Sequence, residues 1–251
     1  MPASAWLSAA SATLKVASLN LCTDEYLLLL ARPQEIASVS YLSRDPRESV
    51  LWRLARRHAA NAGSLESALR PKPTLLLTMG GGGRSTALLA RRLGIRTLDL
   101  PYPGSIADVE RQALTVAAAL DDRRRAVPIL RELAELRRAA PPQGADAAFL
   151  GGGGLSLDPA ALGSEWMRLA GLRQRALPGG RLTLETLAIR PPQVLLRSEY
   201  RTGQWSRGAA WLRHPLVQRL HSRTIPVDGR AWTCAGLPMV DEIRRLRQRL
   251  K

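Results

Sequence analysis

Short aliphatic runs alternate with longer amphipathic segments along most of the chain. Runs of this kind, bounded by turn residues, are typical of buried parallel strands, and they predict strands at 15–19, 36–39, 75–78, 95–98, 147–150 and 224–227. Apolar residues at helical spacing predict helices at 23–31, 85–93, 164–170 and from Pro238 onward. Alternation of strands and helices with short loops indicates an α/β fold built on parallel sheets.

The longest helical stretch lies in the middle of the chain. Apolar residues recur at helical spacing between Asp108 and Leu120 and again between Arg125 and Ala139, and Pro141 and Pro142 end the pattern. Pro128 is tolerated because it falls in the first turn of the second part. We therefore expect a connecting helix at 105–142 between an N-terminal lobe at 14–104 and a C-terminal lobe at 143–251.

The two lobes carry an internal repeat. Residues 64–77 align with residues 183–196 at a constant offset of 119, so that Glu66 matches Glu185 and Pro73 matches Pro192. Each copy begins with a hydroxyl residue suited to cap a short helix, with a glutamate in its first turn. A proline turn and an aliphatic strand follow, which indicates that the lobes arose by duplication.

The N-terminal segment, residues 1–13, stands outside this pattern. Ala10, Ser11 and Ala12 have the small-x-small pattern of a signal-peptidase site, although the residues before them lack a basic start and a long apolar core. Two interpretations remain, a shortened export signal and a flexible N-terminus, and the export signal agrees with the resemblance described below. No run of 18 apolar residues is present, so no membrane-spanning helix is predicted.

The formal net charge of +16 raises a nucleic-acid hypothesis. The basic residues are almost all arginines and are scattered, with short clusters at 123–125 and in the last helix, and no nucleic-acid motif accompanies them. A solvated arginine-rich surface is the favoured interpretation, and arginine also suits anionic ligands.

The sequence contains two cysteines, Cys22 and Cys234, and three well-separated histidines. This set does not provide a four-ligand zinc site, and no resident metal is predicted. Three alternatives stay open for the cysteines: free buried thiols, a disulfide between the lobes, and soft ligands of a metal centre.

Residues 16–25 (VASLNLCTDE), 36–40 (IASVS) and 93–95 (LGI) resemble the periplasmic binding proteins of ABC importers for iron complexes and cobalamin. The resemblance extends over the chain from about residue 14. It implies two Rossmann-like lobes joined by one long backbone helix, with a ligand cleft between them. It also implies a monomeric periplasmic protein without catalysis or cofactor, which captures a ferric siderophore, a cobalamin-type corrinoid or haem for a membrane permease.

In the family that the chain resembles, one surface glutamate on each lobe pairs with arginines of the permease dimer. The repeat places Glu66 and Glu185 at these positions. A plain helix N-terminal acid is the alternative for each, but that role does not require the same residue in both halves.

Candidate cleft residues are those that follow the carboxyl ends of the predicted strands, where α/β folds bind ligands. They are Asn20, Cys22, Tyr41, Arg44, Gly81, Gly82 and Arg84 in the first lobe and Gly152, Gly153, Tyr200 and Trp232 in the second. The aromatic rings suit stacking on a chelate, the arginines suit anionic groups, and the glycines allow backbone amides to approach a ligand. Neither glycine run has the Lys-Ser or Lys-Thr of a nucleotide-binding loop.

Two other classes of function were weighed. A two-lobed enzyme of the glycosyltransferase kind needs a nucleotide-diphosphate site with an acidic pair, and the sequence suggests no such pair and no catalytic constellation. A nucleic-acid-binding protein predicts salt-sensitive retention on DNA, and only the net charge supports it.

Overall fold

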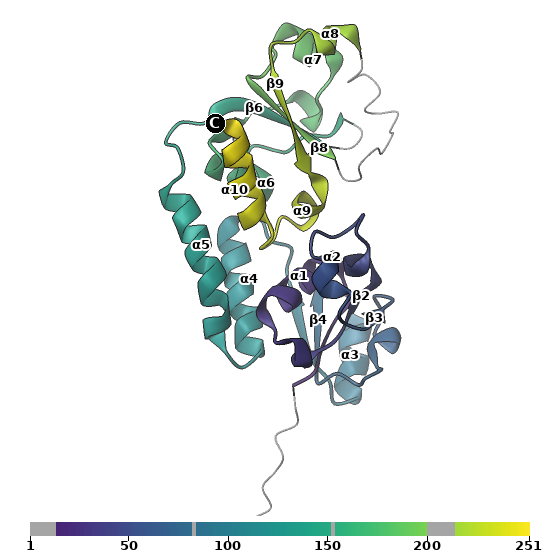
Figure 1. Cartoon of the computed structure of the whole chain (residues 1–251). Helices are drawn as coiled ribbons and strands as arrows, with labels where there is room; N and C mark the ends of the chain where they lie inside the picture. Colours follow the sequence, from purple (N-terminus) through teal and green to yellow (C-terminus); the bar gives the residue numbers. More distant parts are fainter. Residues whose placement is uncertain (1–13, 82–83, 152–153, 200–213) are drawn as a thin grey trace, which may run out of the picture.

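A computed structural model describes residues 14–81, 84–151, 154–199 and 214–251. They form two α/β lobes, flanked on one side by helices α4 (Ile106–Ala119) and α5 (Val127–Arg138) (Figure 1). Among these residues, no helix combines the length and the apolar character needed to cross a bilayer.

The N-terminal lobe contains a five-stranded parallel sheet in the order β3-β2-β1-β4-β5. Its strands are β1 (Val16–Ser18), β2 (Ile36–Ser40), β3 (Ala60–Asn61), β4 (Leu75–Met79) and β5 (Arg96–Leu100). The helical elements between them are α1 (Leu21–Leu30), η1 (Pro33–Glu35), η2 (Tyr41–Arg44), α2 (Trp52–Ala55), η3 (Glu66–Ala68) and α3 (Arg84–Arg92).

Alternate residues of each central strand enter two different apolar clusters. Val16 and Leu75 pack on the side of α1 and α4. Ala17 and Leu76 pack on the side of η3 and α3. Because both faces are covered, β1, β2 and β4 are buried along their whole length, as their continuous aliphatic runs predict.

The C-terminal lobe repeats this plan with one strand fewer. Its parallel sheet has the order β7-β6-β8-β9, made of β6 (Ala145–Leu150), β7 (Leu172–Gln174), β8 (Val194–Glu199) and β9 (Arg223–Asp228). Helices α6 (Leu162–Leu169), α7 (Leu184–Ile189), α8 (Pro215–Gln218), α9 (Gly229–Cys234) and α10 (Met239–Leu250) complete the lobe, together with η6 (Pro178–Gly180). The predicted pair of similar lobes is confirmed, and the described residues of the C-terminal lobe include no counterpart of β3.

The repeated sequence unit forms equivalent structures in the two lobes. Ser64 Oγ accepts a hydrogen bond from the amide of Ser67 ahead of β4, and Thr183 Oγ accepts one from the amide of Thr186 ahead of β8. The first unit is a 3-10 turn and the second an α-helix, but each presents an exposed glutamate in its first turn.

The prediction of one long connecting helix at 105–142 is wrong. The chain turns back between α4 and α5, because Asp121 adopts φ 60° and the side chain of Asp122 caps the short 3-10 helix η4 (Arg123–Ala126). Consecutive short acids stop the helix here, since Asp tolerates the left-handed region and caps well. The segment is a helical hairpin in which α4 packs on α1 and α5 packs on α10.

The hairpin holds both lobes. Arg125, at its turn, forms a two-point ion pair with Glu35 of the N-terminal lobe. At the other end Arg247 of α10 donates to the carbonyl oxygens of Leu136 in α5 and Leu169 in α6. The carboxylate of Glu165 in α6 accepts from the first amide of α4, that of Ile106, at 2.7 Å.

Candidate functional site

The carboxyl ends of both sheets meet where the lobes touch. Helix α1 follows β1 and helix α9 follows β9, and a disulfide between Cys22 and Cys234 joins these helices with 5.3 Å between the Cα atoms. We call the residues that follow the strands at these two edges the interlobe edge. Since parallel strands place such residues at one edge of a sheet, this is where ligands bind in α/β folds.

The disulfide decides among the three alternatives for the cysteines. Both sulfur atoms are bonded to each other, and neither cysteine is free. Free thiols and ligation of a metal by these residues are therefore excluded in this state.

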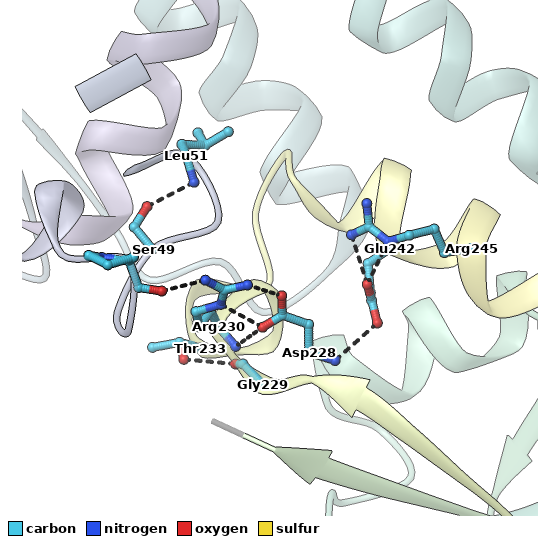
Figure 2. Close-up of polar contacts among 9 residues, drawn as sticks. Ser49, Leu51, Asp228, Gly229, Arg230, Thr233, Glu242 and Arg245 are labelled. Atoms are coloured by element: carbon cyan, nitrogen blue, oxygen red, sulfur yellow. Dashed lines mark hydrogen bonds and ion pairs between the residues drawn. The ribbon is translucent and has the colours of Figure 1, made fainter. Parts of the chain in front are cut away.

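A second contact between the lobes is made by Arg230 of α9. Its guanidinium donates to the carbonyl oxygen of Pro46 in the N-terminal lobe, and it forms a two-point ion pair with Asp228 (Figure 2). Burial raises the pKa of Asp228, but the hydrogen bonds and the charge of Arg230 lower it by a larger amount, so that the net shift is downward. Asp228 thus stays ionised at neutral pH and fixes the guanidinium that spans the lobes.

The second carboxylate of this network is Glu242 of α10, which is 4 % exposed. It accepts from the backbone amide of Asp228 and from the guanidinium of Arg245 (Figure 2). The network therefore attaches α9, the helix that carries both Cys234 and Arg230, to α10.

A third contact is made by Glu25, which is 3 % exposed and has no hydrogen-bond partner for its Oε2 atom. This oxygen lies 2.7 Å from the place that a Cβ atom on Gly236 would occupy, so the carboxyl group of α1 abuts the backbone after α9. Burial, and next the charge of Asp24, raise the pKa of Glu25 well above its usual range. Any side chain at position 236 would collide with Glu25.

Asp24 ties α1 to the end of β2. Its carboxylate accepts hydrogen bonds from the backbone amide and the hydroxyl of Ser40, the residue before η2. Burial raises the pKa of Asp24 to about 7, although the bonds from Ser18, Ser40 and Ser43 oppose the shift. These bonds hold the start of η2, and with it Tyr41, at the interlobe edge.

Tyr41 and Arg44 open and close η2. The ring of Tyr41 is 58 % exposed, and its hydroxyl has no partner among the residues that the structure describes. The Nε atom of Arg44 is buried without a partner. The hydroxyl of Tyr41 is therefore available to a ligand at the carboxyl end of β2, whereas the Nε atom of Arg44 is enclosed by protein.

Asn20 and Cys22 are engaged in local structure. Asn20 caps α1, because its Oδ1 atom accepts from the amide of Thr23 at 3.0 Å. Cys22 is bonded to Cys234. That either residue contacts a ligand stays a prediction.

The loop after β4 is held by Asp99, whose carboxylate accepts from Thr78 Oγ1 and from the amide of Gly81. At Gly80, with φ +77°, a Cβ atom would meet the ring of Tyr102 at 2.3 Å, so glycine is required for this ring to pack over the loop. Arg84 begins α3.

Tyr102 is a candidate ligand-binding residue that was not predicted from the sequence. It is 73 % exposed and stands just beyond the carboxyl end of β5. Its position directly after the aliphatic run of that strand is the signal that identifies it.

In the C-terminal lobe the interlobe edge includes Trp232. Its ring packs on Phe149 with 4.9 Å between centroids, and its Nε1 atom is buried without a partner. Predicted residues Gly82, Gly152, Gly153 and Tyr200 lie outside the described residues.

Glu66 and Glu185 both lie on the surface, in the first turns of η3 and α7. The pKa of each carboxyl is lowered, first by its own backbone amide and then by the hydroxyl of Ser64 or Thr183. The lobes thus present two exposed anions in equivalent settings. Within the described segments, no group of three or more His, Cys, Asp and Glu residues is placed to hold a metal ion.

No protein-family model and no curated protein sequence matches this chain. Solved structures do. The haem-binding protein HutB of Vibrio cholerae superposes with a TM-score of 0.73 at 18% identity, covering 95% of this chain and 99% of that one. BhuT, a periplasmic haem-binding protein solved with two haems, gives 0.71 at 21% identity over 94% and 99% of the chains.

RhuT from Roseiflexus sp. RS-1, a periplasmic haem-binding protein in its apo form, gives a TM-score of 0.71 at 18% identity over 94% and 97%. The likeness thus extends over nearly the whole of each chain. The protein has the two-lobed fold of periplasmic binding proteins of this class.

Proposed function

We propose that the protein is the solute-binding component of an ABC importer and captures a metal chelate between its two lobes. The observation that carries this proposal is the fold match, which spans both lobes and reaches 97–99% of the length of three haem-binding proteins. These similar structures are of binding proteins, which supports capture rather than catalysis.

Haem is the first candidate among the chelates. Ferric haem takes an axial ligand from the protein, and a tyrosine oxygen is one of the groups that serve. Tyr41 and Tyr102 both offer an exposed hydroxyl without a partner within the described residues, and Tyr41 is the first candidate because it lies in η2 together with Arg44. The guanidinium of partly exposed Arg44, three residues from Tyr41, suits a propionate carboxylate.

The contacts between the lobes favour capture with a small movement. Cys22–Cys234 and the bond from Arg230 to Pro46 both join the carboxyl edges of the sheets. A wide opening would have to break the second contact and is prevented at the first. The ligand therefore enters beside these contacts, from the side on which Tyr41 is exposed.

The disulfide also supports export from the cytoplasm. Disulfides persist in oxidising compartments such as the bacterial periplasm and are rare where thiols are kept reduced. The small-x-small pattern at Ala10–Ala12 is in keeping with an export signal. Periplasmic localisation therefore belongs to the proposal.

The test of capture is an absorbance titration of the protein with haem, a ferric siderophore and cobalamin at moderate salt. We expect saturable haem binding, and in Tyr41→Phe an at least tenfold weaker affinity with a changed haem spectrum. Tyr102→Phe is the comparison variant, and a loss of affinity in it in place of Tyr41→Phe would assign the ligand to Tyr102. Saturation by another chelate alone would correct the ligand, and saturation by none of the three would refute capture.

Delivery is assigned to Glu66 and Glu185, which contact arginines on the permease dimer in this proposal. Their equivalent positions on both lobes and their free exposure support it. We expect the double variant Glu66→Arg/Glu185→Arg to keep chelate affinity and lose chelate uptake in cells. Glu135→Arg, at an exposed position on α5, is the charge-matched control for each single variant, Glu66→Arg or Glu185→Arg, and unimpaired uptake by the double variant would contradict docking.

A further inference from the structure

The C-terminal sheet ends at β7, at the position where the N-terminal sheet continues to β3. A pocket of about 560 Å³ lies beside this uncovered edge, between α6, the end of β7 and α7. Residues 175–177 of its lining follow β7, but no lining residue takes part in the contacts between the lobes described above, so the pocket is a separate site.

The lining is strongly basic. It includes four arginines on three elements and their ends: Arg168 of α6, Arg173 and Arg175 at β7, and Arg190 at the end of α7. Among the described residues of the lining, Asp146 is the only acid. Three positive charges are therefore left without a balancing acid in the lining.

Arg175 forms the fixed part of the pocket. It is paired with Asp146 through two nitrogen atoms, and its side chain is only 10% exposed. It also donates to the carbonyl oxygens of Arg190 and Pro191, which holds the end of α7 against β7. Because Asp146 is paired with Arg175, it does not neutralise the charges of the other three arginines.

Arg173 and Arg190 are exposed, and neither makes an ion pair or side-chain hydrogen bond to the described residues. Arg168, with a side chain 55% exposed, lies 3.7 Å from Glu165 and 3.4 Å from the carbonyl of Pro159. These weak contacts leave most of its five N–H donors available. The pocket is thus lined by three arginines whose guanidinium groups have no strong partners among the described residues.

We propose that this pocket is a binding site for a phosphate group, carried by a free phosphorylated solute or by a lipid headgroup. Two oxygens of a carboxylate are satisfied by one guanidinium, whereas phosphate has enough acceptor oxygens for two or three. The hydroxyl of Thr186, also in the lining, adds a fourth group. The site is independent of chelate capture at the interlobe edge.

The test is a calorimetric titration with inorganic phosphate and pyrophosphate, and co-sedimentation with vesicles of phosphatidylglycerol and of phosphatidylcholine. We expect Arg173→Glu/Arg190→Glu to bind the phosphate probes at least tenfold more weakly than wild type. Arg173→Gln/Arg190→Gln should show most of the same loss in affinity. The control is Arg91→Glu/Arg92→Glu on α3, which makes the same change in net charge on exposed residues away from the pocket.

The source of the phosphate follows from which probe depends on the pocket. If binding of the soluble anions is weakened in the pocket variants, the ligand is a free solute. If only binding to phosphatidylglycerol vesicles is weakened, the ligand is a lipid headgroup. Equal losses in the pocket and control variants would show a diffuse effect of net charge and overturn the site. If neither kind of probe binds, the phosphate site is also overturned. Haem titrations of the same variants test chelate capture separately, because capture at the interlobe edge does not depend on the pocket.

Discussion

Arg125 and Glu35 form a buried ion pair, with their side chains 13% and 11% exposed. Burial raises the pKa of Glu35, but the hydrogen bonds from Arg125 and from the amide of Arg32 outweigh burial and lower it. A carboxyl with a lowered pKa stabilises the fold above its unfolded pKa, and this contribution is lost as the pH falls through the folded value.

We therefore expect Arg125→Ala to lower the free energy of unfolding by about 3 kcal/mol at pH 7, because it leaves a buried carboxylate unpaired. The loss should shrink as the pH falls through the lowered pKa that Glu35 has in the folded state. Urea denaturation at pH 7 and at successively lower pH measures it. Arg124→Ala, in the same turn but 89% exposed, should cost nothing measurable, and a loss equal to that of Arg125→Ala would contradict the assignment.

Glu25 behaves in the opposite sense. Its pKa is raised, so the folded state retains the proton longer than the unfolded chain, and stability is lost as the pH rises from about 4.5 through the folded pKa. Glu25→Gln keeps the shape without the charge. We expect a higher melting temperature than wild type at pH 8 and little difference at pH 4.5. A constant difference at both values would show that ionisation of Glu25 is not the cause.

Some residue roles follow from the sequence and others do not. Glu66 and Glu185 could be placed because the repeat identifies them twice. The disulfide could not be chosen among its alternatives, since pairing depends on how the lobes meet. Glu25 gave no signal, because an acid in the first turns of a helix is usually exposed and only the partner lobe buries it.

Elements were predictable where one pattern dominates. β4 begins at Leu75, its predicted position. β8 begins at Val194, in the aliphatic run of the second copy of the repeat. β3 and β7, with two and three residues, carry too few apolar positions to stand out. The break between α4 and α5 was missed because Asp121 and Asp122 fit the polar face of a continuing helix as well as a turn.

The link between α1 and α9 has a consequence for stability. Cys22 and Cys234 are 212 residues apart, and chain entropy gives a loop of this length about 5 kcal/mol of stabilisation at most. We expect Cys22→Ser/Cys234→Ser to melt at a lower temperature than the oxidised protein and to become insensitive to reductant. Thermal melts with and without dithiothreitol measure this, and equal melting of wild type under both conditions would show that the bridge does not form in solution.

At the scale of the molecule, the duplicated plan, the hairpin and the contacts between the carboxyl edges form one arrangement. The net charge of +16 does not determine the fold, and it is the excess that remains after acids such as Glu35 and Asp228 have paired with arginines such as Arg125 and Arg230. The sequence indicated two lobes and an edge between them. It did not indicate the basic pocket beside β7, the edge strand of the C-terminal sheet among the described residues.

The central claim is that one chelate is held between both lobes, and amide hydrogen exchange with and without haem tests it most directly. The account predicts slower exchange at the carboxyl edges of both sheets, in residues 41–51 and 229–235, with no change at the basic pocket. Protection confined to one lobe, or found only beside β7, would contradict capture between the lobes.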